Sequence, residues 1–211
     1  MLRGVIIDLD QTLIDSRKAH ESALNDALER HGFPKIREWV YGITSENLIR
    51  LNFPLMQDEL VSKIAQMKKL KLRNYFKLIK KVKGADELLK FLRASNMKLC
   101  LVTSNSQSEI EHLLLLLKWQ NEFDSTVGKD DVQNPKPSPE PTIAGLKKLN
   151  MHKAEVIYLG DADADIGSAK GAGVKIIISQ AVHNTADADK ADYVVTSLKE
   201  AKNKLRELMK I

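Results

Sequence analysis

Two carboxylates, Asp8 and Asp10, stand at the end of a short apolar run near the start of the chain, in GVIIDLDQT. In an extended strand, residues two apart point the same way, so both side chains can reach one substrate group. Two acids placed in this way can divide the work of a displacement reaction, one attacking as the nucleophile and the other donating a proton. The pair therefore predicts a catalytic centre at the end of the first strand.

Polar residues also follow later apolar runs. They are Thr103, Ser104 and Asn105, then Lys136 in the proline-rich loop NPKPSPEP, and finally Asp161 and Asp165 after the run VIYLG. Four carboxylates at one site repel each other unless a divalent cation lies among them. Because the donors are oxygens and no Cys/His cluster accompanies them, Mg²⁺ is expected rather than zinc. A hydroxyl, backbone N–H groups and a lysine form a phosphate cradle, so the set predicts phosphoryl transfer.

The elements that must position these residues alternate from Gly84 onwards. We expect helices at 85–95, 106–118, 139–149, 163–172 and from 198, and strands at 98–103, 123–127, 156–159, 174–178 and 193–195. This alternation indicates βαβ units and a parallel sheet covered by helices on both faces. Ligands of such sheets bind beyond the carboxyl ends of the strands, which is where the polar residues are expected.

Residues 16–83 show no convincing strand alternation, and we expect a small all-helical insertion there. Residues 15–83 contain 15 Lys and Arg against 8 Asp and Glu, a net charge of +7, whereas the whole chain carries +5. We expect the lysines of residues 63–83 on a solvated helical surface; the alternative is a basic lid that attracts anionic substrates. Nucleic-acid binding is not expected, since neither a recognition motif nor a series of stacking aromatic residues accompanies the charge.

The single cysteine, Cys100, lies in the apolar run LCLV and is expected in the core. One cysteine forms no intrachain disulfide, which fits a reducing compartment. The leucine run at 113–117 is far shorter than the ~20 residues of a membrane span, and the first residues do not resemble a signal peptide. We therefore expect a cytoplasmic protein that acts on a small phosphorylated metabolite, with an oligomeric state that the sequence leaves open.

Four motifs occur in order along the chain: DLDQT at 8–12, VTSN at 102–105, PKPSPEP at 135–141 and GDADADIGSAKGAG at 160–173. Together they resemble the ordered motifs of the haloacid dehalogenase-like superfamily of phosphohydrolases, and most closely its phosphoglycolate phosphatase-like and β-phosphoglucomutase-like branch. The resemblance implies an α/β core with a Rossmann-like parallel sheet, formed by residues 1–15 and 84–211. It also implies a small all-α cap, inserted at residues 16–83.

The resemblance assigns catalytic roles by position. Asp8 would form an aspartyl-phosphate, and Asp10 would act as the acid and base. Thr103, with Ser104 and Asn105 beside it, would bind the transferring phosphoryl group. Lys136 would hold both that group and the nucleophile.

The same resemblance implies a metal site that uses Mg²⁺ as the cofactor. Its ligands would be Asp8, the backbone carbonyl of Asp10, and Asp161. Asp165 would support the metal site, directly or through water.

Two positions depart from the family pattern. Gln11 stands where the family has Gly, which affects the backbone just where the chain leaves the strand. Ala162 replaces a small hydroxyl residue. The dehalogenases that name the family lack the second acid, so the presence of Asp10 argues for a phosphate ester as the substrate.

Two alternatives to a phosphatase remain at this stage: a phosphomutase of the β-phosphoglucomutase type, and a non-catalytic binding protein that keeps the fold. We expect Asp163 to serve the helix start or to face solvent. Chemistry is assigned to none of the five histidines, His20, His31, His112, His152 and His183. Packing roles are expected for Trp39, Tyr41, Arg73 and Tyr75.

Overall fold

The computed structural model describes residues 1–40 and 43–210. The chain divides into two compact units, one comprising Met1–Asp15 with Lys81–Ile211 and the other Ser16–Lys80. In the described part of the chain, no helix is both long enough and apolar enough to cross a membrane.

The first unit is built on a sheet of parallel strands, six in the described residues, in the order β5-β4-β1-β6-β7-β8. The strands are β1 (Gly4–Ile7), β4 (Lys98–Val102), β5 (Ser125–Val127), β6 (Val156–Gly160), β7 (Lys175–Ser179) and β8 (Tyr193–Val195). β1 is buried along its whole length and lies between β4 and β6, with Gly4 opposite both Lys98 and Val156. The predicted parallel sheet is confirmed, and its central strand leads directly into Asp8.

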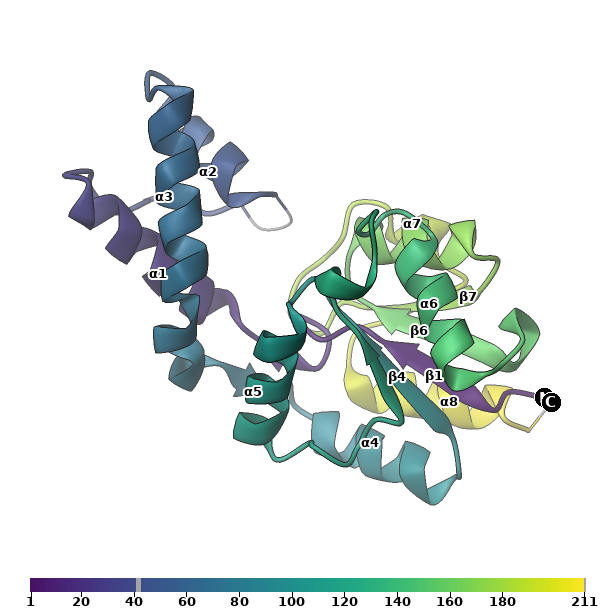
Figure 1. Cartoon of the computed structure of the whole chain (residues 1–211). Helices are drawn as coiled ribbons and strands as arrows, with labels where there is room; N and C mark the ends of the chain where they lie inside the picture. Colours follow the sequence, from purple (N-terminus) through teal and green to yellow (C-terminus); the bar gives the residue numbers. More distant parts are fainter. Residues whose placement is uncertain (41–42, 211) are drawn as a thin grey trace. The chain divides into compact units, whose positions relative to one another are not determined.

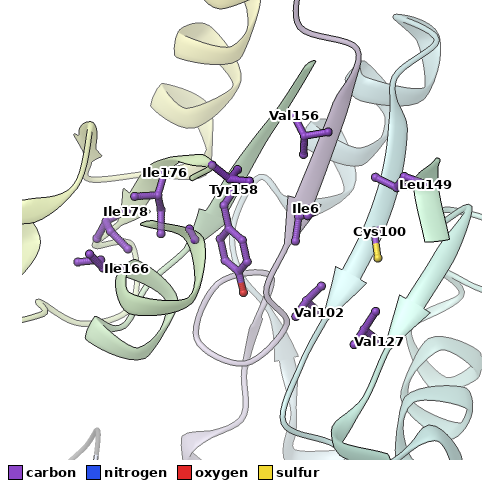
Figure 2. Packing of buried hydrophobic residues seen from close by; sticks show 12 residues of the cluster. Ile6, Cys100, Val102, Val127, Leu149, Val156, Tyr158, Ile166, Ile176 and Ile178 are labelled. Carbon is purple, nitrogen blue, oxygen red and sulfur yellow. The ribbon is translucent and has the colours of Figure 1, made fainter. Parts of the chain in front are cut away.

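Helices cover both faces of this sheet (Figure 1). One face carries α6 (Glu140–Leu149) and α7 (Asp163–Gly171), and the other carries α4 (Ala85–Ala94) and α8 (Leu198–Leu208), while α5 (Gln107–Leu117) packs beside β5. Figure 2 shows the cluster of buried residues that the strands share with Leu149 of α6 and Ile166 of α7; the hydroxyl of Tyr158 gives this member a polar end. Cys100 is buried in this cluster, as expected.

The helix α5 follows Thr103, Ser104 and Asn105, and its start is fixed by a capping residue. Ser106 caps α5: its hydroxyl accepts from the backbone N–H of Glu109, and the Glu109 carboxylate accepts from the backbone N–H of Ser106 at 2.8 Å. This reciprocal capping box stops the helix from extending backwards. Residues 103–105 therefore stay in a loop at the end of β4.

The segment in which only helices were expected contains one short strand. β3 (Lys80–Lys81) pairs with β2 (Ile14–Asp15), and the backbone N–H of Val82 donates to the carbonyl of Leu13 at 2.9 Å. Two-residue strands bury too little to leave an alternating pattern, so the sequence shows no sign of them. Residues 81–83, expected in the insertion, belong to the first unit.

The second unit consists of α1 (Arg17–Arg30), α2 (Ser45–Asn52), α3 (Asp58–Lys71) and a 3₁₀ helix (Leu72–Leu78). These helices share a core that includes Leu24, Ile49 and Ile64. Trp39 packs against this core, Tyr75 is partly buried and Arg73 is exposed; Tyr41 lies outside the described residues. Lys68 differs from the predicted solvated lysines, because it is buried with its Nζ atom 2.9 Å from Nδ1 of His20.

Candidate active site

Lys136 joins two of the predicted acids at the carboxyl ends of β1 and β6. Its ammonium group lies 2.6 Å from Oδ1 of Asp8 and 2.7 Å from Oδ1 of Asp165. All three side chains are at most 8% exposed. The backbone N–H of Asp8 donates to the carbonyl of Leu159, which keeps the acid in line with the sheet edge. Asp8 lies 128 positions before Lys136 in the sequence and Asp165 lies 29 positions after it, yet all three side chains meet in one buried ion cluster.

Asp165 is saturated by protein donors. Its Oδ1 accepts from Lys136 and from the hydroxyl of Tyr158 at 3.0 Å, and its Oδ2 accepts from the backbone N–H groups of Asp161 and Ala162, both at 3.1 Å. A carboxylate has about four lone-pair positions, and these contacts use all of them. Gly160 permits this closeness, because a Cβ atom there would lie 2.6 Å from Cγ of Asp165. Asp165 therefore holds Lys136, Tyr158 and the backbone after β6 in position.

Asp161 follows β6 and is 3% exposed. The hydroxyl of Thr12 donates to its Oδ1 at 2.6 Å, from the loop that carries Asp8 and Asp10. Asp8, Asp161 and Asp165 each offer one carboxylate oxygen within 4.8 Å of the others, the only such buried acid cluster found in the described residues. This arrangement brings together three of the four predicted metal-site residues around a set of hard oxygen donors, which suits Mg²⁺.

The protein places these acids at an electrostatic cost. Burial raises the pKa of Asp8, Lys136 counteracts it, and Asp165 and Asp10 raise it further, to about 7. Burial, followed by Asp8 and Asp165, also raises the pKa of Asp161 well above its usual range. For Lys136, burial acts to lower the pKa, but the two acids it contacts raise it well above the ordinary value. The lysine stays charged, and a single lysine does not neutralise the three acids, so the cluster is one that could hold a further cation.

Asp10 and the loop after β4 form the second half of the site. The side-chain amide of Asn105 donates to Oδ2 of Asp10 at 2.6 Å and to the hydroxyl of Thr103 at 2.9 Å. Thr103 is buried, and its backbone N–H donates to the carbonyl of Val127. Ser104 is exposed. The predicted residues of this loop therefore meet Asp10, with Asn105 as the link between them.

Gln11 adopts the left-handed backbone conformation, with φ of 62°. Its backbone N–H donates to the carbonyl of Ile14 at 2.6 Å, which closes the tight turn after Asp10. This is the region of backbone space in which glycine has no steric cost and other residues do. Gln11, in place of the family glycine, is therefore held by the surrounding turn in a strained backbone conformation.

Sequence reasoning missed three contributors. Thr12 lies inside a motif that was recognised, but its contact with Asp161 joins segments 149 residues apart. Tyr158 is the one hydroxyl-bearing residue in the apolar strand β6, and that polar end was the available signal. His183 places Nε2 3.5 Å from Oδ2 of Asp161, and it follows β7, so the strand-end rule that found the other residues applies to it as well.

Asp163 has a different role from that of its two neighbours in the run DADAD. It is the first residue of α7, as expected, and its Oδ1 accepts from the hydroxyl of Thr185 and from the backbone N–H of Asp187. The carboxylate thus holds the segment after β7, which sequence reasoning did not predict.

Comparisons with known proteins agree with this geometry. A family model described as haloacid dehalogenase-like hydrolase matches residues 5–179. The phosphorylated carbohydrates phosphatase of Thermotoga maritima is 29% identical over 195 residues, covering 88% of each chain. The phosphoglycolate phosphatase of Yersinia pestis is 29% identical over 185 residues, covering 83% of this chain and 80% of its own.

Solved structures extend the likeness to the fold. CbbY from Rhodobacter sphaeroides, in complex with phosphate, superposes with a TM-score of 0.77 at 20% identity, over 95% of this chain and 96% of its own. The resemblance drawn from the four motifs is confirmed, and the relatives' activities indicate a phosphoric monoester hydrolase. With the family model matched across the residues that carry Asp8, Lys136 and Asp161, the chain belongs to the haloacid dehalogenase-like hydrolases, in their phosphoglycolate phosphatase-like and β-phosphoglucomutase-like branch.

Proposed function

We propose that the protein is a Mg²⁺-dependent phosphatase that hydrolyses a small phosphate monoester through an aspartyl-phosphate on Asp8. The observation that carries the proposal is the position of the Asp8 carboxylate, buried against Lys136 and within 4.8 Å of oxygens of Asp161 and Asp165. A buried acid with one cationic partner and two acidic neighbours costs the folded state stability, so it is not explained by a structural role. It is suited to a site where a cation and a phosphate group complete the charge balance.

The residues fit a magnesium ion. Its ligands would be the carboxylates of Asp8 and Asp161 and the backbone carbonyl of Asp10. Asp165, whose lone pairs are used by protein donors, would support the site without binding the ion directly. Bound Mg²⁺ would offset the repulsion between the nucleophile and the phosphate oxygens and polarise the phosphoryl group.

The reaction proceeds in two displacements. A carboxylate oxygen of Asp8 attacks phosphorus, the bond from phosphorus to the ester oxygen breaks, and Asp10 gives its proton to that leaving oxygen. Asp10 then takes a proton from water, whose oxygen attacks phosphorus and releases Asp8 with inorganic phosphate. Asn105, 2.6 Å from Asp10, orients this acid, while Thr103, Ser104 and Lys136 bind the phosphoryl oxygens.

The second unit, Ser16–Lys80, is proposed as the cap that selects the substrate and excludes bulk water from the reaction. Relatives named for phosphorylated carbohydrates and phosphoglycolate support a small phosphorylated metabolite as the substrate class. The buried single Cys100 fits a reducing compartment such as the cytoplasm, which is part of the same proposal.

The test is a phosphate-release screen over phosphoglycolate, sugar phosphates and nucleoside monophosphates, with Mg²⁺ and with a chelator. Wild-type protein should release phosphate only with Mg²⁺, and Asp8→Asn should lose this activity. Glu111→Gln, which removes one charge from the surface of α5, serves as the matched control and should retain it. Turnover without metal, or undiminished turnover in Asp8→Asn, contradicts the mechanism; conversion of one sugar phosphate into another without phosphate release would identify a mutase.

A further inference from the structure

His183 lies beside the proposed metal ligand Asp161 and has no part in the mechanism above. Its Nε2 atom is 3.5 Å from Oδ2 of Asp161, with the histidine side chain 19% and the aspartate side chain 4% exposed. On the other side of the same carboxylate, the Thr12 hydroxyl donates to Oδ1 at 2.6 Å. Asp161 therefore has a hydroxyl donor on one oxygen and an imidazole ring beside the other, from two loops far apart in the sequence.

The segment that carries His183 is attached to the helix that follows Asp161. Oδ1 of Asp163 accepts from the Thr185 hydroxyl and, at 3.0 Å, from the backbone N–H of Asp187. Both donors lie within four residues of His183. The acid two positions after the metal ligand thus anchors the loop that brings the imidazole to that ligand.

We propose that His183 is a positioning residue for Asp161 and that Asp163 acts through it, as the anchor of its loop. An imidazole N–H beside Oδ2 and a hydroxyl on Oδ1 restrict rotation of the carboxylate, so that its remaining lone pairs face the ion. Groups that orient a ligand in this way typically change metal affinity by about 10–100-fold when removed. This role rests on the proposed magnesium site.

The proposed arrangement predicts that the effects of removing Asp163 and His183 depend on each other. If Asp163 only capped α7, its removal would act independently of His183. If it holds the histidine in place, the effect of removing it disappears once the histidine is gone, because contacting residues that act as a unit are not additive.

The experiment measures Mg²⁺ binding to the full chain, stripped with chelator, by isothermal titration calorimetry. His183→Ala is expected to raise the dissociation constant by about tenfold, whereas His183→Gln, which keeps an N–H donor, should remain closer to the wild type. Asp163→Ala should weaken binding in a similar way, and Asp163→Asn, which keeps the accepting oxygen, should not. The double variant Asp163→Ala/His183→Ala should bind no more weakly than His183→Ala alone.

Two further measurements separate positioning from loss of structure. Urea unfolding in EDTA should give similar midpoints for all variants, and Asp189→Asn, an acid in the same segment, should bind Mg²⁺ like the wild type. Phosphate release from para-nitrophenyl phosphate should recover in His183→Ala as Mg²⁺ is raised, because affinity is lost and the reacting groups are intact.

The outcomes distinguish this inference from the proposed function. Wild-type affinity in His183→Ala, or an equal loss from Asp163→Ala with and without the histidine, overturns the positioning role while leaving the magnesium site standing. If the wild-type chain binds no Mg²⁺, or if Asp161→Asn binds it unchanged, both fail together.

Discussion

Replacing Asp8 with Asn is expected to stabilise the metal-free protein at the same time as it abolishes turnover. Burial raises the pKa of this carboxyl, against the influence of Lys136 and with that of Asp165 and Asp10, from 3.8 to about 7. In the unfolded chain the pKa returns to its ordinary value. Between about pH 4 and pH 7 the folded protein therefore binds more protons than the unfolded chain, so the free energy of unfolding falls as the pH rises through this range and stays low above it.

The magnitude follows from the size of the pKa change. One pKa unit corresponds to about 1.36 kcal/mol, so a change of about three units costs the folded state about 4 kcal/mol at pH 8, about 2 kcal/mol at pH 5 and almost nothing at pH 3. Asn has the same shape as the neutral acid and still offers an oxygen to Lys136. Asp8→Asn should regain these amounts, most of them at pH 8.

The assay is urea unfolding in EDTA at pH 5 and pH 8, for the wild type, Asp8→Asn and the surface control Glu111→Gln. The control should follow the wild type at both values. Adding Mg²⁺ at pH 8 should raise the stability of the wild type more than that of Asp8→Asn, because the variant has less charge to neutralise. The reasoning fails if Asp8→Asn is no more stable than the wild type at pH 8, or if its gain is equal at the two pH values.

Three other substitutions probe the same site. Lys136→Met leaves Asp8 and Asp165 without their shared ammonium group and should lower the free energy of unfolding by about 3–5 kcal/mol at pH 8 in EDTA; a loss as large at pH 5, where Asp8 takes up a proton, would count against this explanation. Gln11→Gly relieves the positive φ and should raise the free energy of unfolding by about 1 kcal/mol with activity retained, and a lower urea midpoint would show that the side chain matters more than the backbone. Gly160→Ala places a Cβ atom 2.6 Å from Cγ of Asp165 and should cost about 1–3 kcal/mol in urea unfolding, with weaker Mg²⁺ binding; wild-type values for both would mean that Asp165 has room to move.

Much of the core was predictable because its signals are local. Short buried runs separated by helical segments specify a parallel sheet, and acids directly after such runs specify where Asp8 and Asp161 lie. Lys136 follows β5 in a proline-rich loop, and the structure puts its ammonium group 2.6 Å from Asp8.

The missed features depend on tertiary contacts that leave no pattern in the sequence. His183 reaches Asp161 because its loop is attached to Asp163, and nothing within that loop indicates the attachment. Lys68 reads as one more surface lysine until α1 and α3 pack together and place it beside His20. The strain at Gln11 likewise appears only when the turn after Asp10 has closed.

The central position of β1 has a consequence for how the protein acquires its activity during synthesis. β1 is made before both of its partners: one edge pairs with β4, which begins at Lys98, and the other with β6, which begins at Val156, so both edges are paired only after β6 has been made. Pairings between residues so distant in the sequence slow folding. Until both pairings have formed, the aliphatic strand β1 can pair with wrong partners. The helices of Ser16–Lys80, by contrast, find their neighbours locally and can form early. Asp8, the proposed nucleophile at the end of β1, is therefore made well before the strands that fix its position.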